Sequence, residues 1–177
     1  LFVGSEGTLG IITELTLRLF GRPESIAAAV CDFPDVESAV NAAILCVQMG
    51  IPVARVELLN AVQMQAVNLY SGTGYPERPH LFLEFHGSEA GVAEQSAQVA
   101  ELVADCGGSD FQWSTRTEEQ NALWRARHDA FYAEKAAQPG GLWRTTDICV
   151  PISTLAKAIT DTEADLAEHG RQAYILG

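Results

Sequence analysis

The chain has 177 residues, of which 47% are hydrophobic and 19% are charged. This composition can bury a core in one domain of ordinary size and excludes a disordered chain. With 11 Lys and Arg against 23 Asp and Glu, the net charge is −12. Such a charge repels polyanions, so we expect no nucleic-acid partner and no attraction to an anionic membrane surface. No apolar run reaches the roughly 18 residues of a transmembrane segment.

The cysteine pattern indicates the compartment. Cys31, Cys46, Cys106 and Cys149 form no Cys-x-x-Cys pair and have no histidine at a zinc-like spacing. We therefore expect reduced thiols and a cytoplasmic location. Peripheral attachment to a membrane and, in a eukaryote, a mitochondrial location remain open alternatives.

The first residues form a glycine-rich stretch, LFVGSEGTLGIITELTLRL. Its alternation predicts a strand or a bent pair of strands over residues 9–19, and Gly21 and Pro23 predict a domain boundary near residues 20–24. The stretch is not a P-loop, because no Gly-Lys-Ser/Thr follows, and it enters a strand where the dinucleotide fingerprint would enter a helix. It is therefore either a tight turn or a nest of N–H groups that holds an anion, with Ser5 and Thr8 as further donors.

Strands and helices alternate after the boundary. The patterns predict helices from Asp35 to Gly50 and at 61–70, 88–105, 117–138 and 153–169. They predict strands at 26–33, 53–60, 80–87, 110–115 and over the final AYIL, and a strand or an extended segment at 145–152. Four strands with two long crossover helices favour an α+β fold with a ferredoxin-like antiparallel sheet packed with helices.

The longest predicted helix carries an arginine within an apolar stripe. At helical spacing, Arg127 shares a face with Leu123, Trp124, Ala130 and Phe131. A guanidinium keeps its charge, and burying it without a partner costs several kcal/mol. Arg127 must therefore extend to solvent, pair with a carboxylate of the chain, or bind an anion from outside. Its planar fork suits a carboxylate, so an organic acid is the natural external ligand.

Two segments resemble a known family. FVGSEGTLGIITELTLRL resembles the closing segment of the FAD-binding domain in FAD-linked oxidases of the vanillyl-alcohol oxidase type. LWRARHDAFYA, followed by TTDICVPIS, resembles the C-terminal domain of that family, most of all in cytochrome-type D-lactate dehydrogenases and glycolate oxidase flavoprotein subunits. The resemblance implies that residues 1–20 are the terminal strands of an FAD-binding domain. Residues 21–177 would then be a truncated C-terminal substrate or cap domain, with both chain ends being cuts.

The resemblance also implies the cofactor and the site. FAD would lie against seven residues, Ser5, Glu6, Gly7, Thr8, Gly10, Ile11 and Ile12. Arg127 would hold the substrate carboxylate, with Trp124 and Phe131 shaping the pocket. Relatives that act on dicarboxylates carry a threonine where this chain has Phe131 and a lysine where it has Thr145. The implied substrate is therefore a small monocarboxylic 2-hydroxy acid, D-lactate first, with glycolate or another short-chain acid as the runner-up.

By the same resemblance, the parent enzyme would oxidise the hydroxy acid to a 2-oxo acid by hydride transfer to the flavin. The family's divalent-metal ligands begin in a His-x-Gly-Asp-Gly-Asn stretch, which would lie beyond Gly177. We therefore expect no catalytic or metal-binding residue in this segment, and no activity from it alone. His80 and His86, six residues apart, are expected on one side of a strand as loop or surface residues. The alternative function is a non-catalytic ferredoxin-like module that binds a ligand or forms a homodimer; the electron acceptor is left unassigned.

Overall fold

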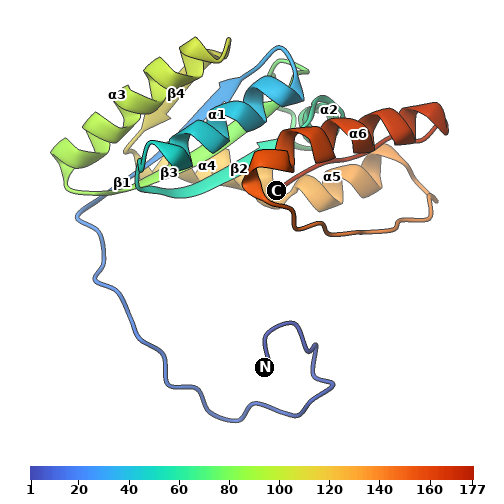
Figure 1. Cartoon of the computed structure of the whole chain (residues 1–177), viewed down its shortest axis with the longest axis horizontal. Coiled ribbons are helices and arrows are strands. Elements are labelled where there is room, and N and C mark those ends of the chain that lie inside the picture. Colours follow the sequence, from blue (N-terminus) through green and yellow to red (C-terminus); the bar gives the residue numbers. More distant parts are fainter.

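A computed structural model describes residues 1–177, and its folded part is a four-stranded antiparallel sheet with helices on both faces (Figure 1). The strands are β1 (Ser25–Asp32), β2 (Val53–Leu59), β3 (His80–Gly87) and β4 (Ser109–Ser114), in the order β2-β3-β1-β4. Helix α1 (Val36–Gln48) connects β1 to β2, and α3 (Glu89–Asp105) connects β3 to β4. Two such crossovers make the ferredoxin-like arrangement, so the predicted fold class is confirmed.

Local capping explains why most predicted boundaries agree with the structure to within two residues. Asp35 begins α1 by accepting a hydrogen bond from the Ser38 N–H at 2.7 Å. Ser88 begins α3 in the same way, through the Gly91 N–H at 3.1 Å. An additional helix, α2 (Ala61–Ser71), lies between β2 and β3, and Asn60 caps it. Each cap satisfies an N–H group that the helix leaves without a partner.

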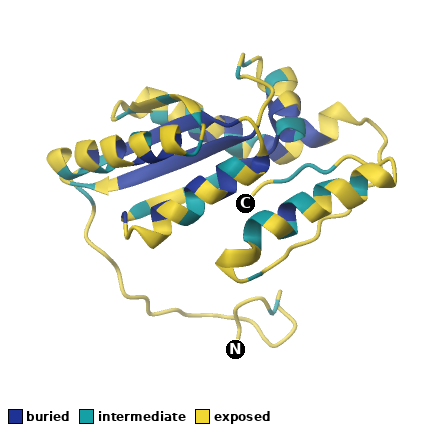
Figure 2. Cartoon of the chain, turned by 45° about the horizontal axis from the view of Figure 1, so that its top comes forward, coloured by how far each residue is buried: buried dark blue, intermediate teal, exposed yellow.

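The sheet separates two packing layers. On one side, which we call the α1 face, lie α1, α3 and α6 (Leu155–Glu168), and a cluster of 19 buried residues. On the other side, the α4 face, lie α2, α4 (Thr117–His128) and α5 (Ala130–Ala137), with a cluster of 11 buried residues. Strand β1 alternates between the two layers, with Ala27 and Ala29 on the α1 face and Ala28 and Val30 on the α4 face. Because helices cover both sides, this strand is buried almost throughout (Figure 2).

The N-terminal residues differ from the prediction. Residues 1–24 form no strand and extend away from the sheet (Figure 1). A strand needs hydrogen bonds to a neighbouring strand, and residues 9–19 make none with the rest of the chain. The alternating side chains of Ile11, Leu15 and Leu17 are accordingly exposed.

Two further predictions, for the helix at 117–138 and the final strand, are wrong in part, and the alternative left open at 145–152 is decided. The helix predicted at 117–138 is two helices in the structure: α4 ends at His128, and α5 begins after Asp129 and packs against α2. Residues 145–151 form extended backbone without a strand partner, which leaves Cys149 exposed. The final strand is reduced to one antiparallel bridge between Leu59 and Leu176 at the edge of β2.

Candidate functional site

Arg127 on α4 reaches across to Glu57 on β2. Its Nε donates to Glu57 Oε2 at 2.8 Å, and its Nη2 lies 2.7 Å from the same oxygen. The Arg127 side chain is 21% exposed and that of Glu57 is 28% exposed. Of the three possibilities that the sequence leaves open, the structure realises the pair with a carboxylate of the chain.

This pair uses only one edge of the guanidinium. An arginine has five N–H donors; here Nε donates to Glu57 Oε2, and Nη2 forms an ion pair with the same oxygen. Both N–H groups of Nη1 and the second of Nη2 have no partner in the chain. These three donors form the outer fork that binds a carboxylate through two parallel hydrogen bonds. The pair with Glu57 therefore leaves Arg127 able to bind a second, external carboxylate.

A second contact joins β2 to α4 beside this pair. The guanidinium carbon of Arg55 lies 5.0 Å from the centre of the Trp124 ring, within the range of a cation–π interaction. Arg55 and Glu57 are two residues apart on β2, so both point to the α4 face. Trp124 and Arg127 are three apart on α4, so they lie one above the other. The two contacts together join α4 to β2.

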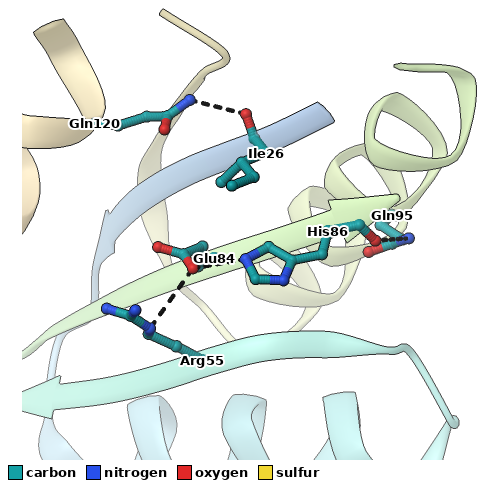
Figure 3. Close-up of polar contacts among 6 residues, drawn as sticks. All are labelled: Ile26, Arg55, Glu84, His86, Gln95 and Gln120. Atoms are coloured by element: carbon teal, nitrogen blue, oxygen red, sulfur yellow. Dashed lines mark hydrogen bonds and ion pairs between the residues drawn. The ribbon is translucent and has the colours of Figure 1, made fainter. Parts of the chain in front are cut away.

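Glu84 on the neighbouring strand β3 forms an ion pair with Arg55. Its Oε1 lies 3.5 Å from Arg55 Nε and 2.7 Å from His86 Nε2, so one carboxylate oxygen serves both (Figure 3). Glu84 is buried, whereas Arg55 and His86 are partly open to solvent. Gln95 donates to the His86 carbonyl at 3.5 Å from the side of α3. A buried carboxylate of this kind is stable only with such partners.

Three of the five buried polar atoms without a partner lie in this layer, and the other two, Gln95 Oε1 and Ser96 Oγ, are on α3. Trp124 Nε1, Gln63 Oε1 and Glu134 Oε1 are buried and make no hydrogen bond in the chain. Burial raises the pKa of the Glu134 carboxyl, and the positive charge of Arg127 partly offsets this rise. Gln63 donates from Nε2 to the Ala130 carbonyl at 3.2 Å, which joins α2 to the start of α5.

The structure places the other pocket residues differently from Arg127. Trp124 is buried under Arg55, so its ring is part of the packing between helix and sheet. Phe131 is 44% exposed on α5, and Lys135 Nζ lies 4.4 Å from the centre of its ring. Thr145 lies in the exposed extended segment. The three predicted substrate residues thus share one layer, but only Trp124 and Arg127 come from the same helix.

The glycine-rich stretch forms two turns. The Ser5 N–H donates to Phe2 O and the Thr8 N–H to Ser5 O, and Gly4 and Gly7 adopt φ angles of 79° and 80° that favour glycine. Seven residues were predicted to contact FAD, and all lie in this stretch, which extends away from the sheet (Figure 1): Ser5, Glu6, Gly7, Thr8, Gly10, Ile11 and Ile12.

The geometry of this stretch suits a backbone-held nucleotide. The N–H groups of Glu6, Gly7 and Gly10 donate to no acceptor in the chain, and no atom of another part of the chain lies within 4 Å of a side chain built at Gly7. Donors left free in this way can bind an anionic group. The residues therefore fit a role beside the flavin nucleotide.

The histidines need one correction. His80 and His86 do lie on one side of β3, as predicted, but His80 is buried, with Nδ1 2.8 Å from the Arg78 carbonyl. Burial lowers the pKa of His80, which favours the neutral ring. No group of three or more His, Cys, Asp or Glu side chains has an arrangement that could hold a metal ion.

Sequence reasoning missed Glu57, Arg55 and Glu84 as members of the site. Period-two alternation in VARVELLN does place Arg55 and Glu57 on one face. The alternation does not reveal that α4 packs on this face of β2, because that contact joins distant parts of the sequence.

The comparisons with known proteins agree with this geometry. Residues 22–177 match the family described as FAD linked oxidases, C-terminal domain. The chain is 50% identical over its whole length to a probable mitochondrial D-lactate dehydrogenase of Danio rerio, covering 36% of that protein. It is 43% identical to a mitochondrial D-lactate dehydrogenase [cytochrome] of Arabidopsis thaliana, over 94% of this chain and 29% of that protein. The chain thus spans about a third of the length of these relatives.

A solved structure shows the same fold. An alkyldihydroxyacetonephosphate synthase superposes with a TM-score of 0.67 at 16% identity, over 94% of this chain and 35% of that one. No helix of this structure is both long and apolar enough to cross a lipid bilayer. On the match over residues 22–177, the chain belongs to the family of FAD linked oxidases, in which it represents the C-terminal domain.

Proposed function

We propose that this chain is the substrate-binding part of an FAD-dependent 2-hydroxy-acid dehydrogenase that oxidises D-lactate to the 2-oxo acid. The unused outer fork of the Arg127 guanidinium is the observation that carries this proposal. The names of the relatives support it, because both are D-lactate dehydrogenases. Both names also include a mitochondrial location, which we propose for this protein if its source is a eukaryote.

In this proposal, residues 1–20 close the FAD-binding domain and residues 21–177 cover the substrate. FAD, when bound, accepts the hydride from the carbinol carbon of the substrate. Arg127 binds the carboxylate end-on and so orients the carbinol carbon, and fixed orientation of this kind supplies a large share of the rate. Trp124 keeps the helix that carries Arg127 against the sheet, and Phe131 limits the space one turn further on.

The charges around Arg127 favour a monocarboxylate. Glu57 binds Arg127 directly, and the buried Glu134 lies close enough for the arginine to affect its pKa. Arg55 on the same face is already paired with Glu84, whereas Lys135 has no ion pair and lies against Phe131. A second substrate carboxylate close to Arg127 would meet the negative charge of Glu57 and Glu134, so a lactate-like acid fits better there than a dicarboxylate.

The test is Arg127→Met in the full-length flavoprotein that contains this chain. Losing two charge-assisted hydrogen bonds of about 1.5–3 kcal/mol each should lower kcat/KM for D-lactate by about 10²- to 10⁴-fold. Arg125→Met is the matched control, because Arg125 is exposed on the same helix and has no ion pair. Steady-state kinetics, with the flavin absorbance spectrum as a check of FAD content, measures the effect. A variant that keeps its kcat/KM would show that Arg127 does not bind the substrate.

A further inference from the structure

We infer that Glu57 is the positioning residue of this site: it fixes the Arg127 guanidinium so that the outer fork faces the substrate carboxylate. This inference rests on the proposed function, since it assigns the orientation of the same arginine. Glu57 itself does not touch the substrate in this arrangement. It acts through Arg127.

The first argument is the geometry of the pair. Two donors of Arg127, Nε and Nη2, meet a single oxygen of Glu57 at 2.8 and 2.7 Å. The hydrogen bond from Nε and the ion pair of Nη2 place the same edge of the guanidinium against Glu57, so the opposite edge, formed by Nη1 and the outer N–H of Nη2, is directed away from Glu57. The side chain of arginine loses about 2 kcal/mol of rotamer entropy when it is ordered, and in this chain that cost is met before a ligand arrives.

The second argument is that strand β2, which carries Glu57, is held rigidly. In the sheet, Glu57 stands opposite Phe82 of β3, which is fully buried. The next residue, Leu58, exchanges backbone hydrogen bonds with Gly177 on the other side of β2. The strand is therefore held from both edges at the position of Glu57, so its carboxylate is a fixed reference point for the arginine on the neighbouring helix.

The third argument is that the pair is built for more than packing. A structural arginine–carboxylate pair usually matches two N–H groups with two oxygens. Here Glu57 Oε1 makes no hydrogen bond, and three N–H groups of Arg127 remain free. Both side chains are also partly open to solvent, so a ligand can reach the free donors.

The experiment compares Glu57→Ala and Glu57→Gln in the full-length holoenzyme, with D-lactate as the probe. Glu57→Ala removes the acceptor, and we expect KM for D-lactate to rise by about 10- to 100-fold, because a displaced group of this kind costs about that much. Glu57→Gln keeps an oxygen that can accept from Nε and Nη2, so we expect it to recover most of the loss. Glu94→Ala, an exposed residue of α3 on the other face, is the control and should match the wild type.

A double variant distinguishes the positioning role of Glu57 from the substrate-binding role of Arg127. When Arg127→Met is present, adding Glu57→Ala should leave kcat/KM unchanged, since nothing remains to be positioned. If Arg127→Met abolishes turnover but Glu57→Ala keeps the wild-type KM, the positioning role is wrong and the proposed function stands. If Arg127→Met itself keeps the wild-type kcat/KM, the proposed function is wrong. A Glu57→Ala protein that only melts at a lower temperature, with KM unchanged, overturns the inference as well.

Discussion

The two faces of the sheet are built on different principles. The α1 face is apolar throughout its cluster of 19 buried residues, and three helices cover it. The α4 face has a smaller cluster of 11, and beside it lie most of the buried polar side chains. These are Asp32, Gln63, His80, Glu84 and Glu134.

This difference separates stability from chemistry. Buried apolar area on the α1 face contributes stability of the ordinary kind, at about 25 cal/mol per Å². The α4 face gives up some of that gain to hold charges in fixed places, as functional sites in proteins commonly do. A change on the α1 face should therefore alter the free energy of unfolding, whereas a change on the α4 face should alter binding and pH behaviour.

The largest effect is expected for Phe85→Ala. Phe85 is fully buried on β3 and belongs to the α1-face cluster. Removing the ring leaves a cavity, so the free energy of unfolding should fall by about 3–5 kcal/mol. Urea unfolding followed by circular dichroism measures this loss. The KM for D-lactate of the protein that remains folded should be unchanged, and a changed KM would mean that the two faces are not independent.

An intermediate effect is expected for Gly108→Ala. An added Cβ would lie 2.5 Å from Val103 Cγ1 and 2.7 Å from Phe33 Cε1, two buried side chains of the α1 face. Overpacking of this kind costs about 1–3 kcal/mol. Gly74→Ala is the control, because nothing lies within 4 Å of its added Cβ, and its free energy of unfolding should stay near the wild-type value. Equal stability of the two variants would show that the contact at Gly108 relaxes freely.

The sequence predicted the α1 face well because its signals are local. Cap residues such as Asp35 and Ser88, and apolar residues at helical spacing, determine where the crossover helices begin and which side they bury. The strand predicted at 9–19 was wrong for the opposite reason, since a strand depends on a neighbour that the pattern does not contain.

The site was predictable only in part. The position of Arg127 in an apolar stripe was a local signal, and it correctly indicated a residue that needs a partner. Which partner it takes depends on a contact between residues 70 positions apart, from Glu57 on β2 to α4. The interruption at Asp129 is also absent from the periodicity, and α5 beyond it packs on α2, which is distant in the sequence. No pattern within one helix records such contacts.

The smallest effect concerns Glu134, and it tests the α4 face alone. Because burial raises the pKa of its carboxyl, the folded state holds a proton that the unfolded state has already released. Stability should therefore fall as the pH rises from the ordinary carboxyl range, near 4.3, through the raised pKa. Glu134→Met removes this carboxyl and its unpartnered oxygen, so it should stabilise the protein at pH 7 by about 1 kcal/mol and by less at pH 5.

The sign of this pH dependence distinguishes Glu134 from His80, the buried histidine of the same face. Burial lowers the pKa of His80, so its titration lowers the free energy of unfolding as the pH falls below about 6.5. For Glu134, the free energy of unfolding falls as the pH rises. The informative quantity is therefore the difference between Glu134→Met and the wild type, measured by thermal unfolding from pH 5 to pH 8, because the contribution of His80 cancels in it. Glu94 is exposed on α3, so the difference in stability between Glu94→Met and the wild type should not change with pH. A flat difference for Glu134→Met as well would mean that its carboxyl titrates normally, and the α4 face would then resemble the α1 face more closely than its buried charges indicate.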